Sequence, residues 1–168
     1  MRITTFTDFS LRTLIYLASL PPGQMSSVQQ VSKVYNVSQN HMVKVVGKLK
    51  KLGYIHAQRG KGGGISIAQA PEDINIGQVI AQMENHMDGV DCNAPACQLA
   101  PCCELRKALM VGMQAFITAM ENYTLADIMT NKAQLSPLLF INQPEDRDKE
   151  TAEISDDNSI ADQNQGQM

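Results

Sequence analysis

Two short amphipathic segments joined by a three-residue turn constrain the fold of this chain more than any other feature. Residues 28–34 carry valine at every third position, and residues 39–52 carry apolar side chains at spacings of three and four. Both patterns predict helices. The connection between them, residues 35–37, is short enough to hold the two helices against each other. We therefore expect a helix-turn-helix from about Val28 to Lys51.

A glycine-rich loop follows the second of these helices. Residues 54–59 and 65–68 are short, rich in β-branched and aromatic side chains, and flank the sequence GKGGG at residues 60–64. This pattern predicts a β-hairpin with a glycine tip. A helix-turn-helix followed directly by a hairpin is a winged helix, so we expect a mainly α fold with a small β-hairpin wing.

Residues suited to helix ends mark several boundaries. Ser27 and Ser38 are expected to cap the two helices of the helix-turn-helix, and Thr7 to cap an earlier helix that continues to about Leu20. Gly53 stands where a left-handed residue commonly ends a helix. Local capping chemistry thus supports three helices in the first third of the chain.

Three further helices are expected after the hairpin: one from Ile76 to about Met87, a long one over residues 103–120, and a shorter one that Thr124 can cap and that runs through Met129. The long helix carries an apolar stripe that is longer than a single core readily needs. We expect this stripe to form a dimer interface, although a plain core helix has the same pattern. Its members are Leu105, Leu109, Met113, Phe116 and Met120.

Charge is distributed unevenly along the 168 residues, whose overall net charge is −3. Residues 1–80 hold nine Lys and Arg against three Asp and Glu, a net of +6. Residues 141–168 hold two basic against eight acidic residues. This asymmetry indicates a polyanion-binding domain over residues 1–80 and a separate regulatory part over 81–142. We expect residues 143–168 to be an acidic disordered tail, because they are polar and lack aromatic side chains.

Polar and basic residues on the second helix of the helix-turn-helix indicate DNA binding. Residues near the start of such a helix reach base edges, where Asn and Gln can pair with adenine, and later lysines contact phosphate or guanine. In the wing, glycines allow close approach to the backbone while the cations flank the minor groove. The alternatives are a solvated basic face and an ordinary hairpin turn. The expected DNA-contacting residues are Ser38, Gln39, Asn40, His41, Lys44, Lys48, Lys51, Arg59 and Lys61.

All four cysteines lie within twelve residues, at Cys92, Cys97, Cys102 and Cys103. Such clustering favours metal binding or thiol chemistry over a set of structural disulfides. Thiolates hold iron–sulfur clusters or zinc, and a low-pKa thiol near a helix start can act as a redox sensor. Spacing alone leaves these three interpretations open.

Five segments together resemble the iron–sulfur winged-helix regulators of the Rrf-two family, and in particular its nitric-oxide-sensitive branch. They are FTDFSLRTLIYLASLP, VSQNHMVKVVGKLKKLGYIHAQRGKGGG, INIGQVI, ENYTLADI and the C-x4-C-x5-C loop. The likeness covers about residues 1–140. It implies a cytoplasmic homodimeric repressor that binds a palindromic double-stranded DNA operator, takes nitric oxide as its signal, and is not an enzyme.

The resemblance also implies one iron–sulfur cluster per subunit, of the 2Fe-2S or the 4Fe-4S type. The family ligand pattern falls on Cys92, Cys97 and Cys103, and Asp8 of the partner subunit is implied as a further ligand. For Asp8, a first-turn acid favoured by the helix dipole is an equal alternative. Cys102 departs from the family pattern, and we expect it to pack as a small apolar residue or to remain a spare thiol.

Two other functions fit parts of the sequence. A sister regulator of iron–sulfur assembly or cysteine metabolism would have the same fold. A zinc- or thiol-dependent redox enzyme would use the cysteines as its active centre, but it needs a nearby general base, and His86 is the one histidine after residue 80. No apolar run reaches the roughly 20 residues of a membrane span, and the N-terminus does not suit a secretory signal.

Overall fold

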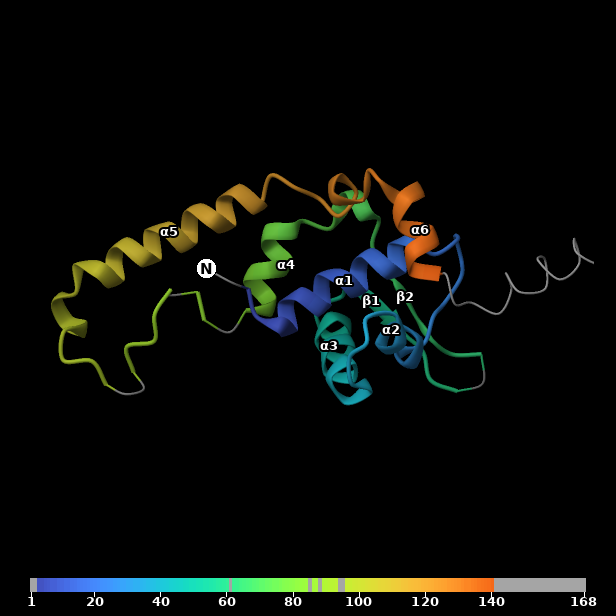
Figure 1. Ribbon diagram of the computed structural model, residues 1–168, viewed down its shortest axis with the longest axis horizontal. Helices are drawn as coiled ribbons and strands as arrows, with labels where there is room; N and C mark the ends of the chain where they lie inside the picture. Colours follow the sequence, from blue (N-terminus) through green and yellow to red (C-terminus); the bar gives the residue numbers. More distant parts are fainter. Residues whose placement is uncertain (1–2, 61, 85, 88, 94–95, 141–168) are drawn as a thin grey trace, which may run out of the picture. The chain divides into compact units, whose positions relative to one another are not determined.

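The computed structural model describes residues 3–60, 62–84, 86–87, 89–93 and 96–140 (Figure 1). The expected tail, residues 143–168, and the wing residue Lys61 lie outside the described residues. The chain divides into two compact units, Met1–Lys132 and Ala133–Met168. In chain order the helices and strands are α1 (Thr5–Ser19), α2 (Val28–Val34), α3 (Gln39–Lys51), β1 (Ile55–Ala57), β2 (Ile65–Ile67), the 3-10 turn η1 (Pro71–Asp73), α4 (Ile76–Met83), η2 (Ala100–Cys102), α5 (Glu104–Met120), η3 (Asp127–Met129) and α6 (Lys132–Phe140).

Helices α2 and α3 form the expected helix-turn-helix. The Ser27 hydroxyl accepts a hydrogen bond from the Gln30 amide at 3.1 Å, and the Ser38 hydroxyl accepts one from the His41 amide at 3.2 Å. Asn36 in the turn has a φ of +50°, a left-handed conformation that asparagine tolerates better than most residues. The local capping chemistry therefore defines both helix starts, as expected.

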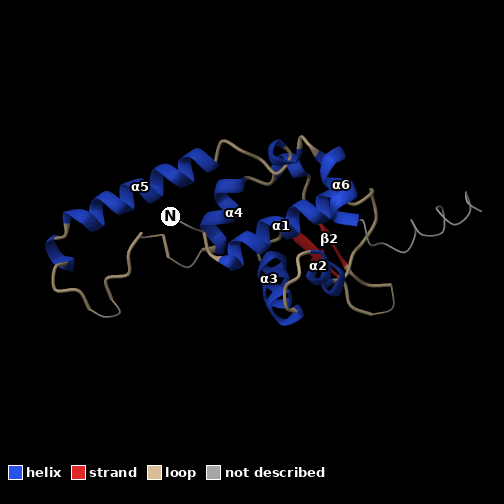
Figure 2. Ribbon diagram, in the orientation of Figure 1, coloured by secondary structure: helices blue, strands red, loops and turns tan. Residues whose placement is uncertain are grey.

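The wing is a two-stranded antiparallel hairpin (Figure 2). Ile55 pairs with Ile67 and Ala57 with Ile65, and the amides of Ser26 and Ile65 also donate to each other's carbonyls. A Cβ at Gly63 would overlap the carbonyl of Gln58. Glycine is required there because the two arms of the wing approach each other closely. The mainly helical winged-helix fold class is confirmed.

Helix α1 lies at the centre of this part of the molecule and contacts α3, α4 and β2. Its Leu14 and Tyr16 are fully buried. Around them, the core is built from hydrophobic side chains of every helix and strand from α1 to α4. They include Leu17, Val31, Met42, Val45, Leu49, Ile55, Ile65, Ile76, Val79, Ile80 and Met83.

The start of α1 and the end of α4 differ from the expected boundaries. Thr4 caps α1, accepting from the Thr7 amide at 3.3 Å, while Thr7 itself is buried. The Thr4 amide and hydroxyl donate to Glu84 Oε1 at 2.7 and 3.1 Å. Helix α4 ends at Met83 rather than near Met87, because Glu84 adopts an extended conformation as its C-cap. A contact across 80 residues thus joins the residues that stand at the two boundaries.

Helix α5 is longer than its neighbours and mostly exposed. All 17 of its residues are described, and of these Ile117 is buried. Its C-terminal end joins α4: the Asn75 side-chain amide donates to the Glu121 carbonyl at 2.6 Å, and the Ile76 amide donates to the Tyr123 carbonyl at 2.9 Å. The helix is therefore anchored at one end. Among the described helices, none is both long and apolar enough to cross a membrane.

Helix α6 was not expected from the sequence. It contains Pro137 and begins at Lys132, whose Nζ donates to the Ala18 carbonyl at 3.0 Å. Its apolar residues have no helical periodicity, which explains why the pattern did not reveal it.

Candidate functional site

Helix α3 presents one face to solvent, which we call the exposed face of α3. Its residues are Gln39, Asn40, Val43, Lys44, Gly47 and Lys51. The opposite side of α3 buries Met42, Val45 and Leu49 in the core. Four of the residues expected to contact DNA therefore lie together on one surface. The sequence analysis missed Val43 and Gly47, because neither is polar.

Two of the residues expected to contact DNA, His41 and Lys48, are partly covered by residues of α1 and α4. His41 is half-buried, with its ring 5.9 Å from that of Phe6 and 5.6 Å from that of Phe9, both edge-on. Lys48 Nζ donates to the Met83 carbonyl at 3.1 Å and lies 5.7 Å from the Phe6 ring centroid. These side chains lie on the flank of α3 that contacts α1 and α4. Tertiary neighbours partly cover that flank, so these two side chains do not share the outward face of Asn40, and their contact with DNA stays a prediction.

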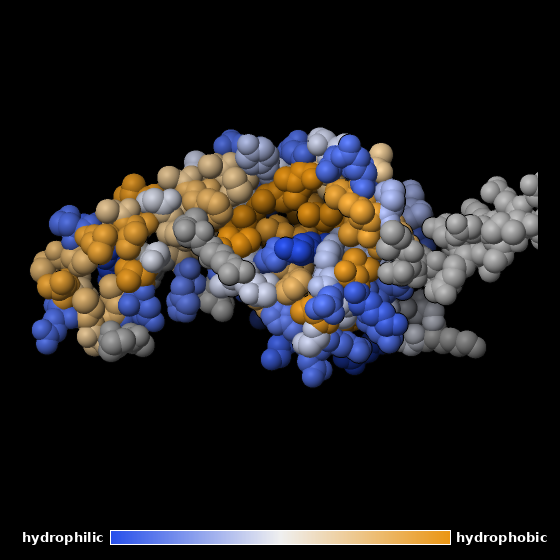
Figure 3. Space-filling model, in the orientation of Figure 1, coloured by the Kyte–Doolittle hydropathy of each residue, from blue (hydrophilic) through white to orange (hydrophobic). Residues whose placement is uncertain are grey.

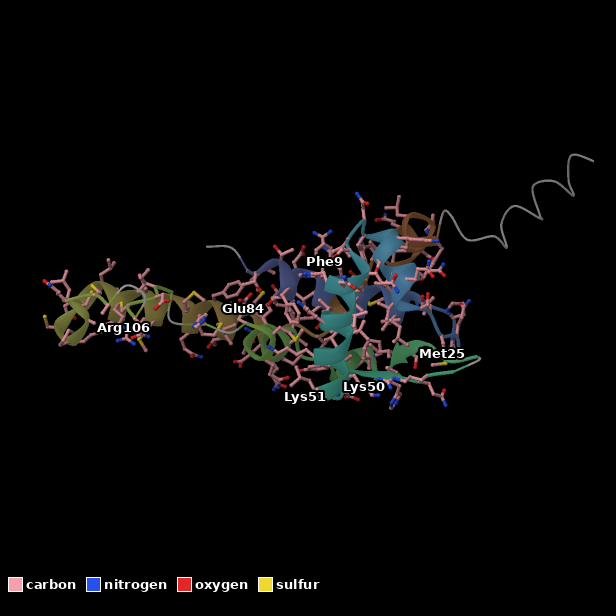
Figure 4. The ribbon with its side chains drawn as sticks, turned by 90° about the horizontal axis from the view of Figure 1, so that it is seen from below. Phe9, Met25, Lys50, Lys51, Glu84 and Arg106 are labelled. Atoms are coloured by element: carbon pink, nitrogen blue, oxygen red, sulfur yellow. The ribbon has the colours of Figure 1, made fainter. Side chains whose placement is uncertain are left out.

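Further cations lie at the C-terminal end of α3 and in the wing. Figure 4 labels Lys50 and Lys51 there; Lys51 is exposed, and Lys50 Nζ donates to the Ala57 carbonyl at 3.2 Å, which connects α3 to β1. Arg59 is exposed at the end of the hairpin arm. Together with Lys44, these residues make the surface of the winged helix cationic, as a phosphate-binding surface requires.

The four cysteines are free thiols on the connection between α4 and α5, residues 84–103, which we call the thiol segment. Cys92 and Cys103 are half-buried, and Cys97 and Cys102 are exposed. Backbone turns compact the segment: the Cys97 amide donates to the Cys92 carbonyl at 3.0 Å, and the Cys102 amide donates to the Leu99 carbonyl at 3.1 Å. Within the described residues, no three His, Cys, Asp or Glu side chains converge closely enough to hold a metal ion.

The surroundings of Cys103 fit an anionic metal centre. Cys103 is the N-cap of α5, and its sulfur accepts a hydrogen bond from the Arg106 amide at 3.4 Å. The positive end of the helix favours a negatively charged sulfur there. Arg106 Nε is buried and has no hydrogen-bond partner among the described residues (Arg106 is labelled in Figure 4). A soft thiolate beside an unsatisfied cationic donor suits an iron–sulfur cluster, whose ligand set carries negative charge.

Asp8 lies in the first turn of α1, half-exposed, with its Oδ1 accepting from Arg12 Nε at 2.8 Å. This hydrogen bond, with the charge of the carboxylate, raises the pKa of Arg12 above its ordinary value. The pair is exposed and adds little stability. Asp8 thus has the local role of a first-turn acid, and the implied role of Asp8 of the partner subunit remains a prediction.

The apolar stripe expected to form a dimer interface is divided between two sides of α5. Met113, Phe116 and Met120 are half-buried, and the first two line a small cavity with Ile80 of α4 and His86. A different surface is open to solvent, which we call the exposed face of α5; Figure 3 shows apolar residues along this helix. Its residues are Leu105, Ala108, Val111, Gly112, Ala115 and Ala119. Leu105 is 66% and Val111 71% exposed.

A larger hollow than this small cavity lies elsewhere in the first unit. A cavity of about 910 Å³ is lined by the end of α1, the loop 21–25 and the outer side of the hairpin. Its walls are mainly apolar, and none of the expected site residues lines it. The functional candidates are therefore surfaces and a loop rather than a deep pocket.

Comparison with known proteins places the chain among transcriptional regulators. A family model described as "Rrf2: Iron-dependent Transcriptional regulator" matches residues 3–131. Among solved structures, CymR, the global cysteine regulator of B. subtilis, has 21% identity and a TM-score of 0.60, covering 78% of this chain and 98% of that one.

Two other solved structures are similar in fold. Oxidized CymR of Staphylococcus aureus has 24% identity and a TM-score of 0.61, with 77% of this chain and 97% of that chain covered. IscR of T. potens has 19% identity and a TM-score of 0.60, with coverages of 78% and 88%. At these identities the likeness supports the fold.

Proposed function

Because this chain belongs to the Rrf2 family of transcriptional regulators, we propose that it is a cytoplasmic homodimeric repressor that senses nitric oxide through an iron–sulfur cluster, as the NsrR branch of the family does. The observation that carries the proposal is the combination of the exposed face of α3 with a thiol segment ending at the N-cap of α5. The first suits DNA, and the second suits a cluster. On this proposal the protein has no enzymatic activity.

The DNA part of the proposal is supported by charge and geometry. Asn40 and Lys44 stand on the exposed face of α3, and Arg59 extends the cationic surface into the wing. A homodimer places two such faces about one helical turn apart on one side of the duplex, so its operator is palindromic.

The exposed face of α5 supports the homodimer. Large apolar side chains at Leu105 and Val111 border small residues at Ala108, Gly112 and Ala115. Small residues let two helices approach closely, while the large ones at the border bury apolar area. A second copy of α5 is the occupant that this face fits.

The cluster part assigns Cys92, Cys97 and Cys103 as ligands, with Asp8 of the partner subunit as the fourth. Cys103 is held by the Arg106 amide, and Arg106 Nε is available to neutralise the ligand set. When bound, a 2Fe-2S or 4Fe-4S cluster supplies iron that reacts with nitric oxide. Cys102, on the exposed 3-10 turn before α5, remains outside the ligand set.

Contacts among α1, α3 and α4 provide a route from the thiol segment to the DNA surface. Glu84, at the start of the segment that carries the cysteines, holds Thr4 at the start of α1. Lys48 of α3 donates to the carbonyl of Met83, one residue earlier, and Phe6 of α1 packs against His41. A rearrangement of the thiol segment or of the first turn of α1 would therefore reposition α3.

The experiment is anaerobic purification of the full chain, followed by iron and sulfide analysis and a visible spectrum. Cys92→Ala, Cys97→Ala and Cys103→Ala should each lose the cluster absorption near 400 nm and the affinity for operator DNA. Cys102→Ala is the matched control, adjacent in sequence and equally a thiol, and should keep both. A colourless Cys102→Ala beside a coloured Cys103→Ala would overturn the ligand assignment.

A thiol-based regulator of cysteine metabolism is the second candidate, favoured by the exposed thiols of Cys97 and Cys102 and by the likeness to CymR. It predicts colourless protein whose DNA affinity changes on thiol oxidation. Iron-containing protein that releases DNA on exposure to nitric oxide, and not on mild thiol oxidation, excludes it.

A further inference from the structure

Val43 stands in the middle of the exposed face of α3, with 52% of its surface open to solvent. It is the one large hydrophobic side chain exposed to this degree among the described residues from 3 to 84. The core side of α3 is filled by Met42, Val45 and Leu49. The packing of the protein therefore gives no reason for an apolar, β-branched residue at position 43, where a polar helix former would be more favourable.

Gly47 lies one turn further along the same face. Its backbone is helical, and a Cβ built there meets no described atom within 4 Å. Glycine inside a helix costs about 0.5–1 kcal/mol relative to alanine. Neither a tight contact nor a left-handed conformation in the described structure offsets this cost at Gly47. The two residues that the fold does not explain are thus neighbours on one surface.

We propose that Val43 reads the 5-methyl group of a thymine in the major groove, and that Gly47 lets the backbone of α3 approach the same DNA strand. This inference rests on the proposed DNA-binding function and specifies how it discriminates sequence. Thymine is the base whose major-groove edge carries a methyl group, and an apolar side chain is its natural contact.

The neighbours of Val43 fit this assignment. Asn40 is one turn before it on the same face and can pair with adenine, while Lys44 is adjacent and can contact guanine or phosphate. Residues four positions apart in a helix are separated by about 6 Å along its axis. Gly47 therefore leaves a notch next to the valine, where a larger side chain would hold the helix away from the DNA.

The first experiment uses an operator selected by the full-length protein from a random duplex pool. Each thymine of the half-site is then replaced by deoxyuridine, which lacks the methyl group, and the Kd is measured at fixed salt. One position per half-site should lower the affinity of the parent protein about fourfold, which is the value of burying one methyl group.

Val43→Ala should bind the thymine and uracil duplexes equally, and Lys44→Ala is the matched control. The lysine variant should weaken binding to both duplexes while the thymine-to-uracil ratio stays that of the parent. A parent protein that binds its operator but ignores every uracil replacement overturns the inference and leaves the proposed function standing. Failure to enrich any duplex contradicts the proposed function itself.

Gly47→Ala should change the stability of the protein and its affinity for the operator in opposite directions. The added methyl group should raise the thermal stability of the protein, because alanine is the better helix former and the space is open. It should also lower operator affinity at least about tenfold, because the helix can no longer approach as closely. A variant with raised stability and unchanged operator affinity overturns the role of Gly47.

Discussion

Two regions of the molecule bury their apolar side chains to different extents. One is the winged-helix part, from α1 to α4, and the other is formed by the thiol segment and α5. The first buries side chains such as Leu14, Val45 and Leu49 completely. In the second, Ile117 is the buried residue of α5, and Leu105 and Val111 face solvent. The first part has its own core. The second leaves large apolar side chains exposed, and the proposed second copy would cover them.

The largest expected difference between these regions is the loss in the free energy of unfolding when a leucine is truncated to alanine. Leu49→Ala, which opens a cavity in the winged-helix core, should lower the free energy of unfolding by about 2–5 kcal/mol. Leu105→Ala on α5 should change it by about 0.5 kcal/mol or less in dilute protein. Urea unfolding of both variants at low concentration measures the difference. Equal costs would mean that α5 is packed as tightly as α3.

A charge on the exposed face of α5 tests whether a second copy covers it. Val111→Asp would bury an unpaired carboxylate in the proposed interface, so the dimer dissociation constant should rise at least about a hundredfold. Sedimentation velocity measures this, and circular dichroism should show unchanged helix content. Gln114→Asp, on the polar side of the same helix, should remain dimeric. A dimeric Val111→Asp variant would place the interface on another surface.

The junction of the two regions depends on a glycine. A Cβ at Gly77 of α4 would lie 2.6 Å from the backbone nitrogen of Glu121, so α4 and the end of α5 would have to separate. Gly77→Ala should therefore destabilise the protein by about 1–3 kcal/mol. Gly47→Ala, the same change in open space, should stabilise it. Thermal unfolding compares the two variants, and a stabilised Gly77→Ala would show that the junction is loose.

The smallest effect concerns the segment that follows α5. Asp127 Oδ2 accepts from the amide and the hydroxyl of Thr124, both at 2.8 Å, and these hydrogen bonds lower the pKa of Asp127. Because the folded pKa is below the unfolded one, the stabilisation is present at neutral pH and is lost as the pH falls through the folded pKa. Asp127→Asn should lower Tm by about 1–2 °C at pH 7 and by less below pH of about 4. A difference that does not depend on pH would contradict this origin.

Local chemistry made much of the winged helix predictable. Ser27 and Ser38 cap α2 and α3 as expected, and Gly53 has the left-handed φ of +80° that its position after α3 indicated. These features depend on residues within a few positions of each other. The thiol cluster and the cationic first half were equally visible, because spacing and charge are properties of the sequence itself.

Other features were decided by contacts between distant residues. The sequence pattern predicted that His41 and Lys48 lie on the exposed face of α3. In the structure they lie on its flank, where His41 contacts Phe6 and Lys48 donates to the Met83 carbonyl. On α5, helical periodicity identified an apolar helix without showing which of its apolar residues face α4. Nothing in the residues next to Gly77 indicates that Glu121 packs against it.

The sequence by itself therefore determined the order of the helices and strands from α1 to α5, the helix-turn-helix with its wing, and the grouping of the four thiols, because short-range capping, periodicity and spacing suffice for these. Only the tertiary structure decided which side of α3 and of α5 remains open, because that depends on what packs from elsewhere in the chain. Glu84 illustrates the reason: its carboxylate accepts hydrogen bonds from Thr4, the N-cap of α1, 80 residues away, and no local pattern contains that contact.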